Sequence, residues 1–128
     1  MTIYLAIRSD SRHTRSVLLA AWAAQLADWP DLGAEEPSRG WFDILRDGQA
    51  RARLRAFACD ADGNYAVRDG DPPPSHINLV ELWVPHEECA HIDRYDALAV
   101  RLARHLGWEA WGQDDDGGDV PLWPARMD

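Results

Sequence analysis

The fold is decided by the stretch Ile77-Asn78-Leu79-Val80-Glu81-Leu82-Trp83-Val84-Pro85, the longest nearly continuous apolar run in the chain. Prolines bound it on both sides, with Pro72-Pro73-Pro74 before it and Pro85 at its end, which is typical of a buried central strand. Successive side chains of a strand point to opposite faces. One face would carry Asn78, Val80, Leu82 and Val84 and pack on helices, and the other would carry Ile77, Leu79, Glu81 and Trp83.

Two other segments alternate in the same way. Residues 2–8 place Ile3, Leu5 and Ile7 on one face, opposite Tyr4, Ala6 and Arg8. Residues 49–59 place Ala52, Leu54, Ala56 and Ala58 on one face, opposite Arg51, Arg53, Arg55 and Phe57. Both patterns predict half-buried strands.

A short strand at residues 41–45 precedes the arginine-rich strand, and Arg46-Asp47-Gly48 connects the two as a hairpin turn. A two-residue Asp47-Gly48 loop would place Phe42 and Ile44 beside the arginines. A three-residue loop with Gly48 in the left-handed conformation places them on the alanine face, with Trp41 and Asp43 on the arginine face. We predict the three-residue loop, because it satisfies both the apolar pattern and the charge pairing.

Two helices are expected. The first would cover residues 12–28, after N-cap oxygens in Ser9-Asp10-Ser11, and its apolar stripe is Leu18, Trp22, Leu26 and Trp29. The second would begin at the N-cap Asp93 and end at Gly107, and its stripe is Tyr95, Leu98, Leu102 and Leu106.

The remaining segments complete the predicted architecture. We expect a loop at 31–40, short strands at 65–68 and 108–112, and a flexible acidic tail at 113–128. The fold class is then α+β: a two-layer sandwich whose mostly antiparallel sheet of five to six strands carries both helices on one face. The expected topology is a ferredoxin-like βαββαβ arrangement with an extra hairpin. A chain of 128 residues predicts one domain, 1–128.

Composition narrows the function classes. The net charge of −9 disfavours nucleic acid and anionic membrane surfaces as partners and is compatible with a basic partner. All 13 basic residues are arginines, and together with the abundant alanine this composition suggests a GC-rich genome. Two cysteines are too few for a disulfide scaffold, and residues 1–10 lack the basic segment followed by an apolar stretch that marks a signal peptide. No apolar run approaches the roughly 20 residues of a membrane span, so we expect a cytoplasmic protein.

No catalytic or metal-binding signature is evident. His86-Glu87-Glu88-Cys89-Ala90-His91 lacks HExxH spacing, and Asp60-Ala61-Asp62-Gly63-Asn64 is followed by Tyr65 where a calcium loop requires glycine. Cys59 with His76, and Cys89 with His91, lack the context of a nucleophile. We therefore expect no cofactor and no metal, and we favour a binding protein over an enzyme.

One sheet face is the candidate binding surface, because aromatic and arginine side chains together are typical of interface cores. Its predicted partner-binding residues are Trp41, Asp43, Arg51, Arg53, Arg55, Glu81 and Trp83. The leading hypothesis is an immunity or inhibitor protein that neutralises a basic bacterial toxin or nuclease. One alternative is a ligand-sensing domain or minor enzyme that holds a small anionic ligand with an arginine clamp of Arg51, Arg53 and Arg55. The others are self-association as a homodimer or structural subunit, and a solvated face with weak ion pairs.

Overall fold

The computed structural model describes residues 2–65, 72–114 and 116–124. Within these residues the main sheet has seven strands in the order β3-β4-β5-β7-β1-β8-β9, and every neighbouring pair is antiparallel. The strands are β1 (Ile3–Arg8), β3 (Leu32–Glu36), β4 (Trp41–Arg46), β5 (Gln49–Phe57), β7 (Leu79–Val84), β8 (Glu109–Gln113) and β9 (Asp119–Trp123). Outside this sheet lie the ribbon of β2 (Val17–Leu18) with β6 (His76–Ile77), the helices α1 (Leu19–Leu26) and α2 (Ile92–Leu106), and the 3-10 turns η1 (Pro37–Arg39) and η2 (His86–His91).

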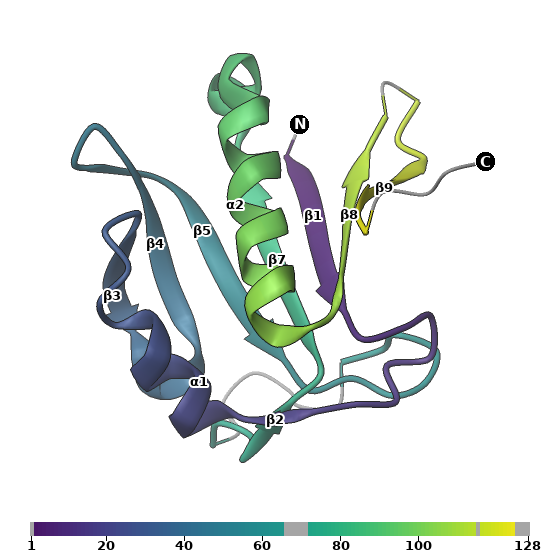
Figure 1. The fold of residues 1–128 in the computed structure, drawn as a ribbon. Coiled ribbons are helices and arrows are strands. Elements are labelled where there is room, and N and C mark those ends of the chain that lie inside the picture. The colour runs from purple at the N-terminus through teal and green to yellow at the C-terminus, as the bar shows by residue number, and fades with distance from the viewer. Residues whose placement is uncertain (1, 66–71, 115, 125–128) are drawn as a thin grey trace.

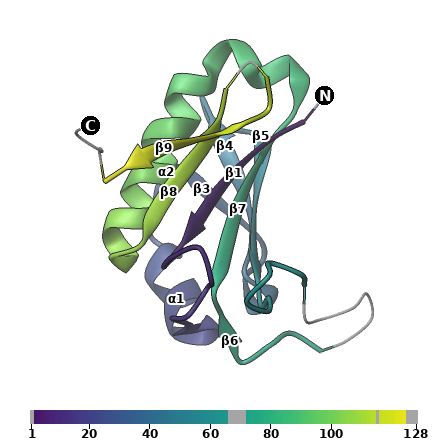
Figure 2. The ribbon, with the colours of Figure 1, turned by 90° about the vertical axis from the view of Figure 1, so that its right-hand side faces the viewer.

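The two helices cover the same face of the sheet (Figure 1). Turned by 90°, the molecule shows α1 and α2 on one side of the strands and leaves the other side without a helix (Figure 2). This arrangement confirms the predicted α+β class with a mostly antiparallel sheet. The sheet is larger than predicted, with seven strands in place of five or six.

The four middle strands have the predicted ferredoxin-like order. β7 and β8 both run antiparallel to β1, which lies between them, and α2 connects them across the sheet. β5 lies on the far side of β7 and is reached from β1 through α1 and the β3–β4 hairpin. The extra hairpin therefore extends the sheet at one edge, and β9 extends it at the other.

β7 is the middle strand, as the apolar run predicts. It pairs with β1 on one side and β5 on the other. Val80, Leu82 and Val84 are fully buried on the helix side. They pack in one core with the apolar stripe of α2, with Leu5 and Ile7 of β1, and with the buried indoles of Trp22 and Trp108. On the opposite face of β7, Leu79 is buried, and Glu81 and Trp83 are half-buried.

The β4–β5 hairpin has the predicted facing but a different turn. Its loop has two residues, Asp47 and Gly48, both with positive φ (55° and 79°), in place of the predicted three. A bulge follows, because Ile44 pairs with Ala52 while Leu45 pairs with Ala50. The extra residue in β5 restores the alternation, so the apolar side chains of β4 face the core even though the turn is the shorter one.

The predicted helix at 12–28 is wrong in its first half, since α1 begins only at Leu19. The Oδ1 atom of Asp10 accepts hydrogen bonds from the amides of Arg12 and Thr14 at 2.9 and 3.2 Å, and Ser9 Oγ accepts one from the amide of Arg15 at 3.1 Å. These bonds satisfy the amides in a turn and so compete with helical hydrogen bonds. The chain then pairs β2 with β6 before the helix starts.

Two segments predicted to be irregular are edge strands. Residues 31–40 contain β3, whose Leu32 is buried while Ala34, Glu35 and Glu36 are exposed. The predicted tail at 113–128 contains β9, joined to β8 by a turn in which Asp114 Oδ1 accepts from the amides of Asp116 and Gly118 at 3.0 and 2.7 Å. Edge strands bury little, so their sequences lack the apolar alternation that marks inner strands.

Smaller corrections concern element ends. α2 begins at Ile92 with His91 in the cap position, so Asp93 lies in the first turn and is not the N-cap. β8 covers Glu109–Gln113, one residue later than predicted. The predicted strand at 65–68 lies outside the described residues except for Tyr65, which forms an isolated bridge with Cys59. Among the described helices, none has the length and apolar character to cross a membrane.

Candidate functional site

The open face is the side of the main sheet turned away from α1 and α2, and strand register decides which side chains meet there. One row across the strands runs through Trp41, Arg55 and Glu81. The next row runs through Asp43, Arg53, Trp83 and Tyr4. Opposite residues in antiparallel strands have Cβ atoms about 5 Å apart, so each row is a line of touching side chains.

Arg55 is the centre of the first row, and it is 3% exposed. Its Nη2 atom lies 3.0 Å from Glu35 Oε2, and its Nη1 donates to the carbonyl of Leu54 at 3.0 Å. Its guanidinium carbon lies 4.7 Å from the ring centroid of Trp41 and 5.6 Å from that of Trp83. A buried charge needs a partner and good hydrogen bonds, and Glu35 with the two indole faces provides them. The Arg55 guanidinium is thus already bound by groups of its own chain.

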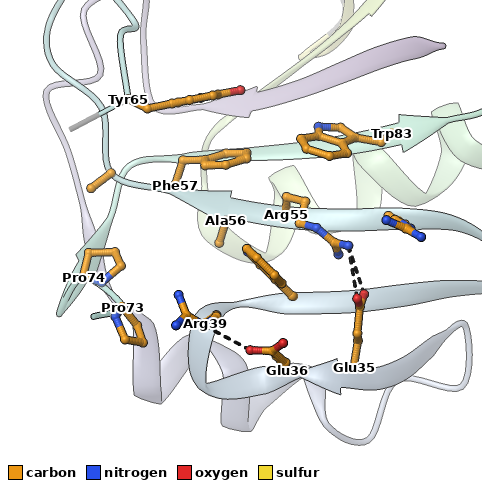
Figure 3. Close-up of a pocket in the computed structure, with 13 residues that line it drawn as sticks. Glu35, Glu36, Arg39, Arg55, Ala56, Phe57, Tyr65, Pro73, Pro74 and Trp83 are labelled. Carbon is orange, nitrogen blue, oxygen red and sulfur yellow. Dashed lines mark hydrogen bonds and ion pairs between the residues drawn. The ribbon is translucent and has the colours of Figure 1, made fainter. Parts of the chain in front are cut away.

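A run of aromatic rings continues from Trp83. Phe57 lies between Tyr65 and Trp83 (Figure 3), with ring centroids 4.2 Å from Tyr65 and 6.2 Å from Trp83. The interplanar angles are 13° and 24°, so the three rings are nearly parallel. Tyr4 meets Trp83 edge-on at 5.9 Å and is 46% exposed. Such a run of partly exposed rings is uncommon on a surface that only meets water.

Glu81 holds the aromatic run in place. Its Oε1 atom accepts a hydrogen bond from the hydroxyl of Tyr65 at 2.7 Å and another from the indole Nε1 of Trp83 at 3.2 Å. Burial, followed by the hydrogen bond to the Glu81 carboxylate, raises the pKa of the Tyr65 phenol above its usual value. The Tyr65 hydroxyl therefore stays protonated at physiological pH, donates a hydrogen bond to Glu81, and is unsuited to act as a general base.

Side chains of the open face line a groove of about 680 Å³. Phe57 and Tyr65 form one wall, the end away from Trp83 is closed by Pro73 and Pro74, and Arg39 and Glu36 lie across from the rings (Figure 3). A volume of this size is within the range of small-molecule sites, roughly 300–1,000 Å³. A second hollow of about 450 Å³ shares Arg53 and Trp83 with the groove and continues to Tyr4, Asp43 and Arg51.

Charges on the open face nearly balance one another. The positive side chains are Arg8, Arg39, Arg51, Arg53 and Arg55, and the negative ones are Glu35, Glu36, Asp43, Glu81, Glu87 and Glu109. Because these sum to −1, most of the formal charge of −9 comes from the rest of the chain. The nearly neutral aromatic face differs from the uniformly acidic surface that net charge alone would predict.

The structure brings the predicted binding residues together on this face. Trp41, Arg53, Arg55 and Trp83 line the groove, Asp43 and Arg51 line the second hollow, and Glu81 fastens the wall. Their predicted roles are not equal. Arg55 is buried and paired, the Arg51 guanidinium is hydrogen bonded to Gln49, and Arg53 is exposed with no hydrogen bond or ion pair in the described part of the chain.

Residues that sequence reasoning missed complete the groove. Glu35 and Glu36 belong to β3, a segment predicted to be a loop, and Arg39 follows in η1 with its Nε 3.0 Å from Glu36 Oε2. Tyr65, Pro73 and Pro74 come from the connection before β7. In the sequence, these residues stand out only by composition, as a tyrosine and three prolines before an aromatic strand. Composition does not show where in the fold their side chains lie.

A second polar cluster lies away from the open face, and sequence reasoning missed it too. Glu88 is 4% exposed, and Arg46 donates to both of its oxygens, from Nε at 2.7 Å and from Nη2 at 2.9 Å. The Tyr95 hydroxyl donates to Glu88 Oε1 at 2.6 Å. The hydrogen bonds from Arg46 and Tyr95 lower the pKa of Glu88 from 4.5 to about 2. This cluster joins η2 and α2 to β4 and has a structural role.

The other candidate sites gain no support. Burial raises the pKa of the Cys59 thiol from 9.0 to about 11, which makes it a poor nucleophile. Asp60 Oδ1 accepts from the amides of Asp62 and Asn64, so that loop is closed by its own hydrogen bonds. Among the described residues, no three His, Cys, Asp or Glu side chains are grouped to hold a metal ion.

Comparison with protein-family models, with curated proteins and with solved structures found no match for this chain. Its function is therefore inferred from the geometry of the open face.

Proposed function

We propose that the protein acts by binding another protein through its open face, most concretely as an inhibitor or immunity protein that neutralises a basic toxin or nuclease. The observation that carries the proposal is the run of partly exposed rings around Trp83 on a face that no described helix covers. Binding energy at protein interfaces is concentrated in tryptophan, tyrosine and arginine side chains. The open face gathers these three residue types from neighbouring strands.

The charge distribution supports two separate roles in binding, attraction of the partner by acidic side chains and contact through the open face. The open face is nearly neutral, and most of the acidic excess belongs to the rest of the chain. Net acidic charge accelerates the approach of a basic partner, and it does so less at high salt. The nearly neutral face then forms the dry centre of the contact. Arg53 and Arg51 are exposed and reach a partner, whereas Arg55 supports the face from beneath.

The test is affinity capture from a lysate of the host with the tagged full chain, followed by kinetics on the captured protein. We expect one basic protein in stoichiometric amount, with an association rate that falls as salt is raised. Arg53→Glu should lose it, since the substitution reverses a charge at the centre of the face. Arg104→Glu is the matched control, because Arg104 is exposed on α2, on the other side of the sheet. Equal capture by wild type and Arg53→Glu would refute the proposal.

Self-association through the same face is the competing outcome. It predicts that light scattering of the purified protein shows a dimer, which Tyr4→Asp dissociates because Tyr4 is an exposed aromatic residue of that face. A dimer that persists at nanomolar concentration and survives in the presence of every captured protein would replace the inhibitor proposal.

A further inference from the structure

Among the described residues that line the groove, one positive charge is left without an ion pair. Of the two acidic side chains in the lining, Glu35 is held by Arg55 and Glu36 by Arg39, each at 3.0 Å. Arg53 also lines the groove, is exposed, and has no ion pair among the described residues. The lining therefore has a local charge of one positive unit, although the whole chain is strongly acidic. A ligand with one negative charge is the electrostatic complement of this groove.

The groove also selects for shape. Tyr65 stacks on one face of Phe57, with centroids 4.2 Å apart and planes 13° apart, which leaves Phe57 one ring face for a ligand. The Trp83 ring lies 6.2 Å from Phe57 at 24°, so these two rings form an apolar wall of the groove. Trp41 lines the groove too, with the Arg55 and Arg39 guanidinium carbons 4.7 and 5.7 Å from its ring centroid. Flat rings gain more from stacking on such a wall than puckered rings of the same size. Pro73 and Pro74 at the closed end add apolar surface and no charge.

We infer that this groove binds a small aromatic carboxylate, whose ring stacks on the wall of Phe57 and Trp83 and whose carboxylate pairs with Arg53. Arginine suits this role because its planar fork donates two parallel hydrogen bonds to a carboxylate. Arg55 and Arg39 are unsuited, because their guanidinium groups already hold Glu35 and Glu36. The three-arginine clamp expected from the sequence is thereby reduced to a single anchor.

This binding site goes beyond the proposed protein binding and does not depend on it. The described residues that line the groove all belong to one chain, so its ligand is measured without any partner. A protein partner, if it covers the same face, would compete with the ligand, but neither result decides the other.

The experiment is calorimetric titration of the full chain at neutral pH with three probes: indole-3-acetate, its neutral analogue indole-3-acetamide, and the non-planar anion cyclohexylacetate. We expect indole-3-acetate to bind at least about tenfold more tightly than either analogue. Arg53→Ala should lower its affinity at least about tenfold, whereas Arg104→Ala should leave it unchanged. Arg104 is the matched control, since it is an exposed arginine of α2 that lines neither the groove nor the second hollow.

Three results would overturn the inference. The amide binding as tightly as the acid would show that Arg53 does not select charge. Cyclohexylacetate binding as tightly would show that the wall does not select planar rings. Absence of binding at millimolar concentration would show that the groove takes no ligand of this class. Urea unfolding of Arg53→Ala tests whether the variant is correctly folded. We expect no loss of stability, because Arg53 is exposed and has no ion pair among the described residues.

Discussion

The buried carboxylate of Glu88 offers the sharpest test of the energetics. Its pKa is lowered from 4.5 to about 2 by hydrogen bonds from Arg46 and Tyr95. A carboxyl whose pKa is lower in the folded state stabilises the fold above its unfolded pKa, and this contribution is lost as pH falls through the folded value. The displacement corresponds to about 3 kcal/mol at neutral pH, of which about 2 kcal/mol is lost by about pH 3.

Counting bonds gives a similar magnitude. Three hydrogen bonds of 2.6–2.9 Å converge on the charged carboxylate. Each is worth roughly 1.5–3 kcal/mol net, and within one network the values do not add. We therefore expect Glu88→Gln to lower the free energy of unfolding by about 3 kcal/mol at neutral pH and by only about 1 kcal/mol at about pH 3.

Urea unfolding followed by tryptophan fluorescence at the two pH values measures both differences. Glu87→Gln is the matched control, because Glu87 is the exposed neighbour in η2 and should leave stability within about 0.5 kcal/mol at either pH. A Glu88→Gln loss that is the same at both pH values would refute this account, because the loss would then come from packing and not from the charge.

Three further predictions concern other parts of the fold. Gly40→Ala should lower the free energy of unfolding by about 3 kcal/mol in urea, because φ is +75° and an added Cβ would lie 2.7 Å from the Cβ of Ala56. Gly48→Ala is the control and should cost about 1 kcal/mol, because its φ of +79° is similar but no atom lies within 4 Å of the added Cβ. Equal losses in the two variants would contradict the close packing at Gly40. The thiol of Cys59, whose pKa is raised to about 11, should react slowly with a thiol reagent at about pH 8 in the native protein and quickly after unfolding. Peptide mapping measures the reaction in both states, and equal rates would disprove the burial of Cys59. Arg55→Lys should lower the free energy of unfolding by about 1–2 kcal/mol, because the guanidinium no longer stacks between the indoles of Trp41 and Trp83. Arg53→Lys is the control and should leave stability unchanged. An unchanged stability of Arg55→Lys would show that this stacking contributes little.

Alternation predicted the inner strands well because burial enforces it. In β1, β5 and β7 a shift by one residue would move every apolar side chain into water, so the pattern fixes both the strand and its faces. The same constraint gave the correct facing of β4 despite the wrong turn, since a bulge in β5 corrected the register. Where burial is weak, this constraint disappears. β3 and β9 lie at the two edges of the sheet, and their polar sequences resemble those of loops.

The helix error has a different physical source. Helical periodicity counts apolar side chains, and it places Trp22 and Leu26 correctly in the core, but Leu18, the first residue of the predicted stripe, is exposed in β2. It does not weigh the side-chain oxygens of Ser9 and Asp10, which hold a turn over residues 9–15 in the structure. In the sequence, the same oxygens also fit the N-cap of a helix beginning at Arg12. Whether such an oxygen caps a helix or closes a turn depends on the next segment of the chain, here β2, which pairs with β6.

For the site, alternation shows which way a side chain points and not what it meets. Arg51, Arg53 and Arg55 occupy equivalent positions in the sequence pattern, and it predicted one role for all three. The structure gives them three environments: a bulge, an open surface, and a buried slot between two indoles. The difference comes from Glu35, which enters from the edge strand that the sequence did not reveal. Loss of binding in an Arg55 variant would thus report a collapsed face, and only Arg53 variants separate recognition from stability.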